Sequence, residues 1–205
     1  MAGSRHRSGA PLILTGLLGG SFNPAHTGHR AISLFAMDAL ALDEVWWLVS
    51  PGNPLKSGVD DMAPLPARLA SAKVMARRSR IRATDIETRL GTRYTVDTVA
   101  ALVRRYPNRR FIWIMGADNI AQFHQWRDWR RLARSVTIAI IARPGYSNLS
   151  AASPASVWLR RFVRRAGSAQ RWTQWRPPAL VLLHFRPDPS SATALRRADP
   201  LWYRR

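Results

Sequence analysis

Two histidines three positions apart, His26 and His29, stand in the segment GGSFNPAHTGHR, which spans residues 19 to 30. An apolar run precedes this segment and an amphipathic stretch follows it, which predicts a turn between a strand and a helix. Residues at i and i+3 share one face of a helix, so both imidazoles would point toward the same place. Gly19 and Gly20 would let the backbone approach a ligand closely, and a helix N-terminus attracts anions. The segment therefore predicts a phosphate site in which both imidazoles donate hydrogen bonds.

Three other interpretations of the histidine pair stay open at this point. A metal site would need further ligands, but residues 1–37 contain no carboxylate and the chain contains no cysteine. A structural pair could cap the turn without touching any ligand. The glycines do not supply the G-x-G-x-x-G pattern of dinucleotide-binding folds, which argues against NAD as a bound cofactor.

The elements that must position this site alternate between short apolar runs and longer amphipathic stretches. We predict strands at 12–18, 45–50, 81–84, 111–116, 136–142 and 179–185, and helices near 29–41, 65–78, 95–105 and 118–133. Near-continuous apolar strands are typical of a parallel sheet that is buried on both faces. The alternation predicts an α/β fold, a doubly wound, mostly parallel Rossmann-like sheet with helices on both faces. In such folds ligands bind at the carboxyl ends of the strands, where the first strand-to-helix turn lies.

Length and composition indicate one domain, because 205 residues with 46% hydrophobic content can build one sizeable core. Residues 1–10 are predicted to be a flexible N-terminal tail and residues 11–205 a single domain. The prolines and glycines between 144 and 178 predict an irregular excursion with one short helix, VWLRRFVRR. No apolar run approaches the roughly 20 residues needed to cross a bilayer. The absence of cysteine fits a reducing compartment, so we expect a cytoplasmic protein.

The formal net charge is +20, and it comes almost entirely from arginine, since Lys56 and Lys73 are the only lysines. Such a charge favours anionic ligands, either nucleotides or nucleic acid. The arginines occur all along the chain, however, so a solvated surface explains the charge equally well. An arginine-rich nucleic-acid-binding protein is therefore an alternative, although it would not explain the glycine turn or the paired histidines.

Several segments together give the chain a resemblance to a known family. GGSFNPAHTGH resembles the (H/T)xGH signature of nucleotidyltransferases that transfer AMP or CMP to a phosphate. The chain is also similar to bacterial nicotinate-nucleotide adenylyltransferases in the segments PGNPLK, GTRYTVDT, WIMGADNIAQFHQWRDW and SSATALRR. The resemblance runs from about residue 15 to residue 197. It departs from the family at Asn23, where many relatives carry aspartate, and at Ala192, where a second serine is common.

The resemblance implies transfer of AMP from ATP to nicotinate mononucleotide, with deamido-NAD and pyrophosphate as products and Mg²⁺ carried by the ATP phosphates. The catalytic residues that it implies are His26, His29, Lys56 and Arg196. The implied ATP contacts are Gly19, Gly20, Ser21, Phe22, His26, His29, Ser191, Thr193 and Arg196. The implied mononucleotide contacts are Thr92, Tyr94, Thr95, Asp118, Trp126 and Arg143. Trp126 would stack on the pyridine ring, and the backbone from Thr92 to Thr95 would offer N–H groups to the carboxylate.

Alternatives remain both for the reaction and for the roles of single residues. Phosphopantetheine adenylyltransferases and cytidylyltransferases would share the phosphate contacts, although the segment GADN to FHQW argues against both. Lys56 could be a solvated loop lysine, Ser191 a helix N-cap, and Trp126 a core tryptophan like Trp129. No resident metal, no membrane and no specific nucleic acid are expected, and the sequence leaves the oligomeric state open.

Overall fold

The computed structural model describes residues 11–52, 62–142, 153–185 and 192–204. Within these residues one sheet has the strand order β3-β2-β1-β4-β5-β7-β6, and every neighbouring pair is parallel. Its strands are β1 (Ile13–Gly20), β2 (Glu44–Val49), β3 (Ile81–Thr84), β4 (Arg109–Gly116), β5 (Thr137–Ala142), β6 (Val163–Arg164) and β7 (Leu180–His184). All except β6 lie where apolar runs predicted strands, and the predicted doubly wound parallel sheet is confirmed.

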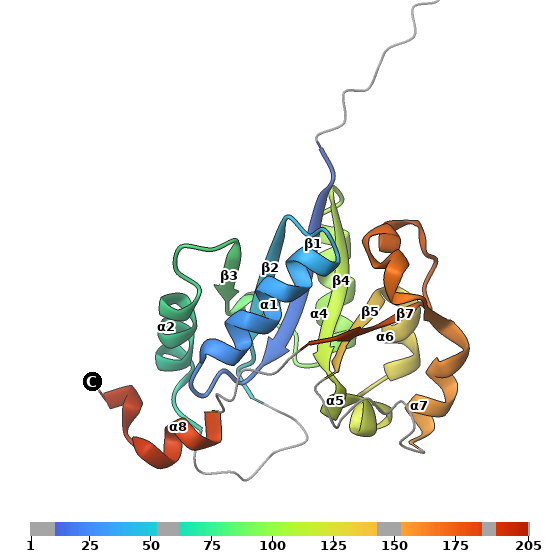
Figure 1. Cartoon of the computed structure of the whole chain (residues 1–205). Helices are drawn as coiled ribbons and strands as arrows, with labels where there is room; N and C mark the ends of the chain where they lie inside the picture. Colours follow the sequence, from blue (N-terminus) through green and yellow to red (C-terminus); the bar gives the residue numbers. More distant parts are fainter. Residues whose placement is uncertain (1–10, 53–61, 143–152, 186–191, 205) are drawn as a thin grey trace, which may run out of the picture.

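Helices cover both faces of this sheet (Figure 1). One face carries α1 (Thr27–Ala39), α2 (Leu65–Met75) and the 3₁₀ helix η4 (Ala166–Gln174). The other face carries α3 (Ile86–Leu90), α4 (Thr95–Arg105), α5 (Ala117–Gln122), η2 (Phe123–Gln125), α6 (Trp129–Ser135) and α7 (Pro154–Leu159). The remaining described helices are η3 (Arg160–Phe162), α8 (Ala192–Ala198) and η5 (Trp202–Arg204). None of the helices in the described ranges has the length and apolarity to cross a membrane.

Neighbouring residues of each strand enter opposite cores, because side chains alternate across a strand. In β4, Phe111, Trp113 and Met115 face the helices α4 and α6, whereas Ile112 and Ile114 face α1 and α2. All five side chains are at most 5% exposed. A strand between two helical layers must be apolar on both faces, which explains why these runs show no polar alternation.

The prediction of one helix over 118–133 is wrong. The segment is divided into α5, η2 and α6, and Trp126 and Arg127 stand in the break. Asp128, the residue before α6, has a φ of 47°, and this left-handed backbone cannot continue a right-handed helix. Apolar residues keep the helical spacing across the break, which is why the sequence predicted a single helix.

The helix predicted over VWLRRFVRR is wrong in its bounds. α7 begins earlier, at Pro154, where the side chain of Ser153 accepts the backbone N–H of Ser156 at 3.2 Å. The chain leaves the helix after Leu159, and Val163 and Arg164 form the short edge strand β6. The sequence also missed α3, which at five residues is too short to be stable without tertiary contacts.

Candidate active site

The turn after β1 leads directly into α1, as the opening segment predicted. Phe22 in this turn has a φ of 47° and is 1% exposed. Its ring lies 4.8 Å from the His29 ring and 5.0 Å from the Trp47 ring, measured between centroids. The buried ring of Phe22 therefore anchors the turn to the hydrophobic core.

His26 and His29 lie side by side, with ring centroids 3.9 Å apart, as their spacing predicted. His26 is the N-cap of α1, and its Nδ1 accepts the backbone N–H of Gly28 at 3.2 Å. The Nδ1 of His29 accepts the backbone N–H of His26 at 3.3 Å. A neutral imidazole whose Nδ1 accepts a hydrogen bond carries its proton on Nε2. The cap thus sets both rings in the tautomer with an Nε2–H donor, so capping and phosphate binding can coexist on opposite nitrogens.

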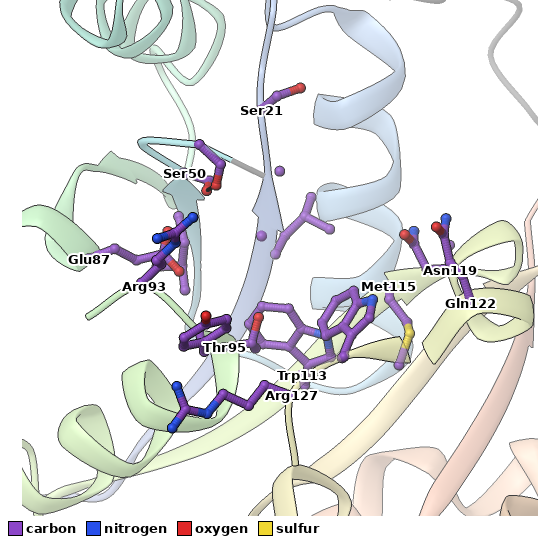
Figure 2. A pocket seen from close by; sticks show the side chains of 18 of the residues that line it. Ser21, Ser50, Glu87, Arg93, Thr95, Trp113, Met115, Asn119, Gln122 and Arg127 are labelled. Carbon is purple, nitrogen blue, oxygen red and sulfur yellow. Dashed lines mark hydrogen bonds between the residues drawn. The ribbon is translucent and has the colours of Figure 1, made fainter. Parts of the chain in front are cut away.

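A cavity of about 550 Å³ opens at the carboxyl ends of β1, β2 and β4. This volume is typical of sites for small molecules. Figure 2 shows Ser21 and Ser50 at the strand ends, Glu87 and Arg93 on one side, and Gln122 on the other. The cavity lies where a doubly wound sheet is expected to bind its ligands.

The cavity brings together six of the residues predicted from the sequence: Gly19, Gly20, Ser21, Tyr94, Thr95 and Trp126. A Cβ added at Gly19 would approach the indole ring of Trp113 to 2.7 Å. Trp113 also lines the cavity, so the missing side chain at Gly19 makes room for an indole against the end of β1. The sequence had explained this glycine by close approach to a phosphate instead.

Other predicted residues lie elsewhere. The N–H of Thr92 donates to the carbonyl of Glu87 at 3.0 Å and Thr92 does not line the cavity, so its contact with the mononucleotide stays a prediction. Asp118 is exposed on α5, and its Oδ1 lies over Gly116. Lys56, Arg143 and Ser191 fall outside the described residues, as does the predicted N-terminal tail.

Arg196 reaches the first turn from the far end of the chain. Its Nη1 donates to the carbonyl of Asn23 at 2.7 Å, and the two residues are 173 positions apart. α8 begins at Ala192, so Thr193 lies in its first turn as predicted. The side chain of Asn23 accepts the backbone N–H of Ala63 at 3.3 Å, a bond that an aspartate oxygen could also accept. The departure from the family pattern at this position therefore leaves the local geometry intact.

Trp126 forms part of the cavity wall. Its ring meets the Trp113 ring edge to face at 6.1 Å and the Phe123 ring at 5.3 Å. Its neighbour Trp129 is 7% exposed and belongs to the core, as predicted. The break before α6 separates the two tryptophans, so one packs inside and the other borders the cavity.

Two cavity residues that the sequence did not single out flank Tyr94. The guanidinium carbons of Arg93 and Arg127 lie 6.0 Å and 4.6 Å from the centroid of its ring. Cations at the rim of a cavity favour anionic ligands. Both arginines stand inside the family segments, but arginine is too common in this chain for sequence alone to distinguish them.

Glu87 is the one carboxylate among the described residues that line the cavity, and it too was missed. It is 7% exposed, and its Oε1 accepts the hydroxyl of Thr98 at 3.3 Å. Burial raises the pKa of Glu87 to about 7, although hydrogen bonds with Thr98 and Ser50 act in the opposite direction. The carboxyl group of Glu87 therefore holds its proton to a higher pH than an exposed glutamate does.

Replacing Glu87 with glutamine should stabilise the protein in alkaline but not in acidic buffer. A carboxyl group whose pKa is raised to about 7 by folding contributes its full stability below its ordinary pKa, and loses it as the pH rises through 7. The amide has no charge to desolvate, so its advantage should grow to about 3 kcal/mol above neutral pH. Urea unfolding at about pH 5 and about pH 8 measures this difference, with exposed Asp38→Asn as the control. An advantage that does not change with pH would contradict the argument.

Comparison with known proteins gives consistent findings at three levels. Residues 17–198 match the model of the cytidylyltransferase-like family. A protein of Erythrobacter litoralis, named "probable nicotinate-nucleotide adenylyltransferase", is 61% identical over 93% of this chain and 86% of its own. One of the same name from Cereibacter sphaeroides is 50% identical over 90% and 97% of the two chains. The solved nicotinic acid mononucleotide adenylyltransferase of Plasmodium falciparum, complexed with NaAD, shares the fold with a TM-score of 0.66 at 17% identity, over 90% and 83% of the chains.

Proposed function

Because the chain belongs to the cytidylyltransferase-like family and, within it, to the nicotinate-nucleotide adenylyltransferases, we propose that it transfers AMP from ATP to nicotinate mononucleotide. The products are deamido-NAD and pyrophosphate, so the enzyme serves NAD biosynthesis. The observation that carries this function is the pair of adjacent imidazoles, His26 and His29, at the start of α1, whose Nδ1 atoms both accept backbone N–H groups.

The chemistry needs positioning more than proton transfer. An oxygen of the mononucleotide phosphate attacks the α-phosphorus of ATP, and a new P–O bond forms there. The bond from the α-phosphorus to the bridging oxygen breaks, and pyrophosphate leaves with that electron pair. Since the second pKa of a phosphate monoester is about 6, the nucleophile is largely dianionic at neutral pH and needs no general base. Catalysis then depends on alignment and on stabilising the charge of the transferred group.

The ATP side of the site is assigned to the β1–α1 turn and to α8. His26 and His29 donate from Nε2 to the transferred phosphate, with His29 as the main transition-state contact. Lys56 supplies a point charge for the nucleotide phosphates, and Arg196 a fork-shaped cation for the leaving pyrophosphate. Thr193, in the first turn of α8, adds a hydroxyl donor, and Ser191 is assigned the same role. Gly19, Gly20, Ser21 and Phe22 supply the backbone along which ATP lies.

The mononucleotide side is assigned to the opposite wall. Trp126 stacks on the pyridine ring, and Tyr94 and Thr95 border the carboxylate. Within the described ranges no acceptor faces the N–H of Thr95 or Val96, the first two residues of α4, and Thr95 lines the cavity. Asp118 is assigned to the ribose hydroxyls, and Arg143 to the mononucleotide phosphate.

Mg²⁺ is proposed to arrive with ATP. The described lining of the cavity offers one carboxylate, Glu87, so phosphate oxygens and water would supply most of its ligands. Its positive charge would offset the charge of the phosphates during transfer. The proposed compartment is the cytoplasm, which suits a chain without cysteine.

A substrate panel tests the proposed function directly. Pyrophosphate release is measured with Mg-ATP and, in separate tubes, nicotinate mononucleotide, nicotinamide mononucleotide and phosphopantetheine. We expect the fastest release with nicotinate mononucleotide and none above background with phosphopantetheine. Release only with phosphopantetheine would assign a different adenylyltransferase. Salt-sensitive binding of random nucleic acid without release from any mixture would favour a nucleic-acid-binding protein.

A further inference from the structure

Arg68 on α2 is a buried cation without a carboxylate partner among the described residues. Its side chain is 1% exposed, and burial lowers its pKa from the ordinary value of arginine. A buried charge is costly unless surrounding groups stabilise it. Nothing in the sequence distinguishes this residue from so many other arginines, so its surroundings must explain its burial.

Four backbone carbonyls surround the guanidinium. Nη1 donates to the carbonyl of Ser21 and to that of Ser50, both at 2.7 Å. Nε donates to the carbonyl of Ala63 at 2.7 Å, and Nη2 to that of Pro51 at 3.4 Å. These carbonyls belong to the residues that follow β1, to those that follow β2, and to the approach to α2. One side chain thus ties together the two strand ends that border the cavity.

These bonds also fix which way the backbone donors point. In a planar trans peptide the C=O and the following N–H point in opposite directions. The carbonyls of Ser21 and Pro51 face Arg68, so the N–H groups of Phe22 and Gly52 point away from it. Neither N–H has an acceptor within the ranges that the structure describes. Gly52 and Ser21 line the cavity whereas Arg68 does not, so the backbone lies between the guanidinium and the cavity.

We propose that Arg68 is a positioning residue for the phosphates of ATP. It holds the strand-end carbonyls on its own side, which leaves the N–H groups of Phe22 and Gly52 as donors to an anion. It also places a positive charge behind them that no described carboxylate neutralises, and low dielectric surroundings make this charge effective. This inference rests on the proposed function for the identity of the anion, because ATP is the polyphosphate that the turn after β1 would bind.

Arg30 provides a matched control. It also lies on the α1–α2 face and donates from Nη1 to backbone carbonyls, those of Met75 at 2.8 Å and Arg77 at 2.9 Å. These carbonyls stand near the C-terminal end of α2, and neither Arg30 nor its partners line the cavity. Loss of either arginine should therefore destabilise the fold, but only loss of Arg68 should affect the nucleotide.

The experiment compares Arg68→Lys and Arg68→Met with Arg30→Lys and Arg30→Met. The Kd of ATP and of tripolyphosphate is measured by calorimetry without the second substrate, the KM of both substrates by pyrophosphate release, and stability by urea unfolding. For Arg68→Met we expect the Kd and KM for ATP to rise about tenfold, which corresponds to roughly one lost hydrogen bond to a charged group. The KM for the mononucleotide should change less than about twofold, and Arg68→Lys should recover part of the ATP affinity because it keeps the charge.

Three outcomes would overturn the role of Arg68. The first is unchanged ATP and tripolyphosphate binding in a folded Arg68 variant. The second is an equal loss in the Arg30 variants, which would mean that stability alone matters. The third is an equal rise in both KM values. If Arg68→Met does not fold, Arg68→Lys decides by the same criteria. A wild-type protein that binds tripolyphosphate but releases no pyrophosphate would contradict the proposed function. The tripolyphosphate affinities of the variants would still test whether Arg68 positions the anion-binding backbone.

Discussion

Replacing His29 with alanine should lower kcat by about a hundredfold or more, because a preorganised donor to transition-state charge contributes roughly 2.7–4 kcal/mol. The expectation rests on the tautomer that the cap enforces, since the Nδ1 of His29 already accepts the N–H of His26. The Nε2–H then points in one fixed direction, so little reorganisation is needed during the reaction. Steady-state pyrophosphate release with both substrates near saturation measures the loss.

Alanine also removes the cap acceptor, so a second variant must separate capping from catalysis. In His29→Asn the side-chain oxygen can replace Nδ1 as the acceptor for the His26 N–H, but nothing replaces the Nε2–H. We expect His29→Asn to unfold at nearly the wild-type urea concentration and to lose as much kcat as His29→Ala. A stable asparagine variant with near-normal kcat would show that His29 serves the helix alone.

The wild-type enzyme should prefer nicotinate mononucleotide over nicotinamide mononucleotide by about ten- to a few hundredfold in kcat/KM. A carboxylate that accepts N–H groups gains charge-assisted hydrogen bonds. An amide that turns its NH₂ toward the same donors leaves them unpaired, at about 1–3 kcal/mol for each. Because the N–H of Thr92 donates to the carbonyl of Glu87, we propose that this receptor is formed by Thr95 and Val96, the first two residues of α4. Equal use of both mononucleotides would contradict the carboxylate receptor.

The variant Trp126→Ala tests whether the backbone of α4 or the Trp126 ring discriminates between the two mononucleotides. Stacking on Trp126 recognises the pyridine ring, which both mononucleotides share. The substitution should therefore lower kcat/KM for both by similar factors and leave their ratio almost unchanged. A collapse of the ratio would mean that the tryptophan makes the choice. The core residue Trp129 is unsuitable as a control, because its replacement would create a cavity in the core.

Local order along the chain was enough to predict the sheet and the first turn. Five of the six predicted strands are recognisable as apolar runs, because a strand covered on both faces has no polar side, whereas the edge strand β3 is half exposed and gave a weak signal. The spacing of His26 and His29 predicted that their rings are adjacent, because three residues nearly complete one helical turn. Where local geometry alone fixes the relation between residues, the sequence was sufficient.

Three features could be seen only in the structure: one backbone conformation, the two histidine caps and one long-range contact. The break at Asp128 depends on one left-handed residue, which the hydrophobic period does not reveal. The tautomer of the two histidines follows from caps made by backbone N–H groups, which have no sequence signature when histidine rather than serine or threonine makes them. The contact of Arg196 with Asn23 spans 173 positions.

The same limit explains why Glu87, Arg93, Arg127 and Arg68 were missed. The sequence does not distinguish a buried glutamate from an exposed one. Nor does it distinguish an arginine that donates to buried backbone carbonyls from one that is exposed to solvent on the surface. Sequence by itself determined the order of the main strands along the chain and the adjacency of His26 and His29, because those depend on residues near in the chain. The tertiary structure decided which charges are buried at the cavity, because burial is set by how the parallel strands and their helices pack together.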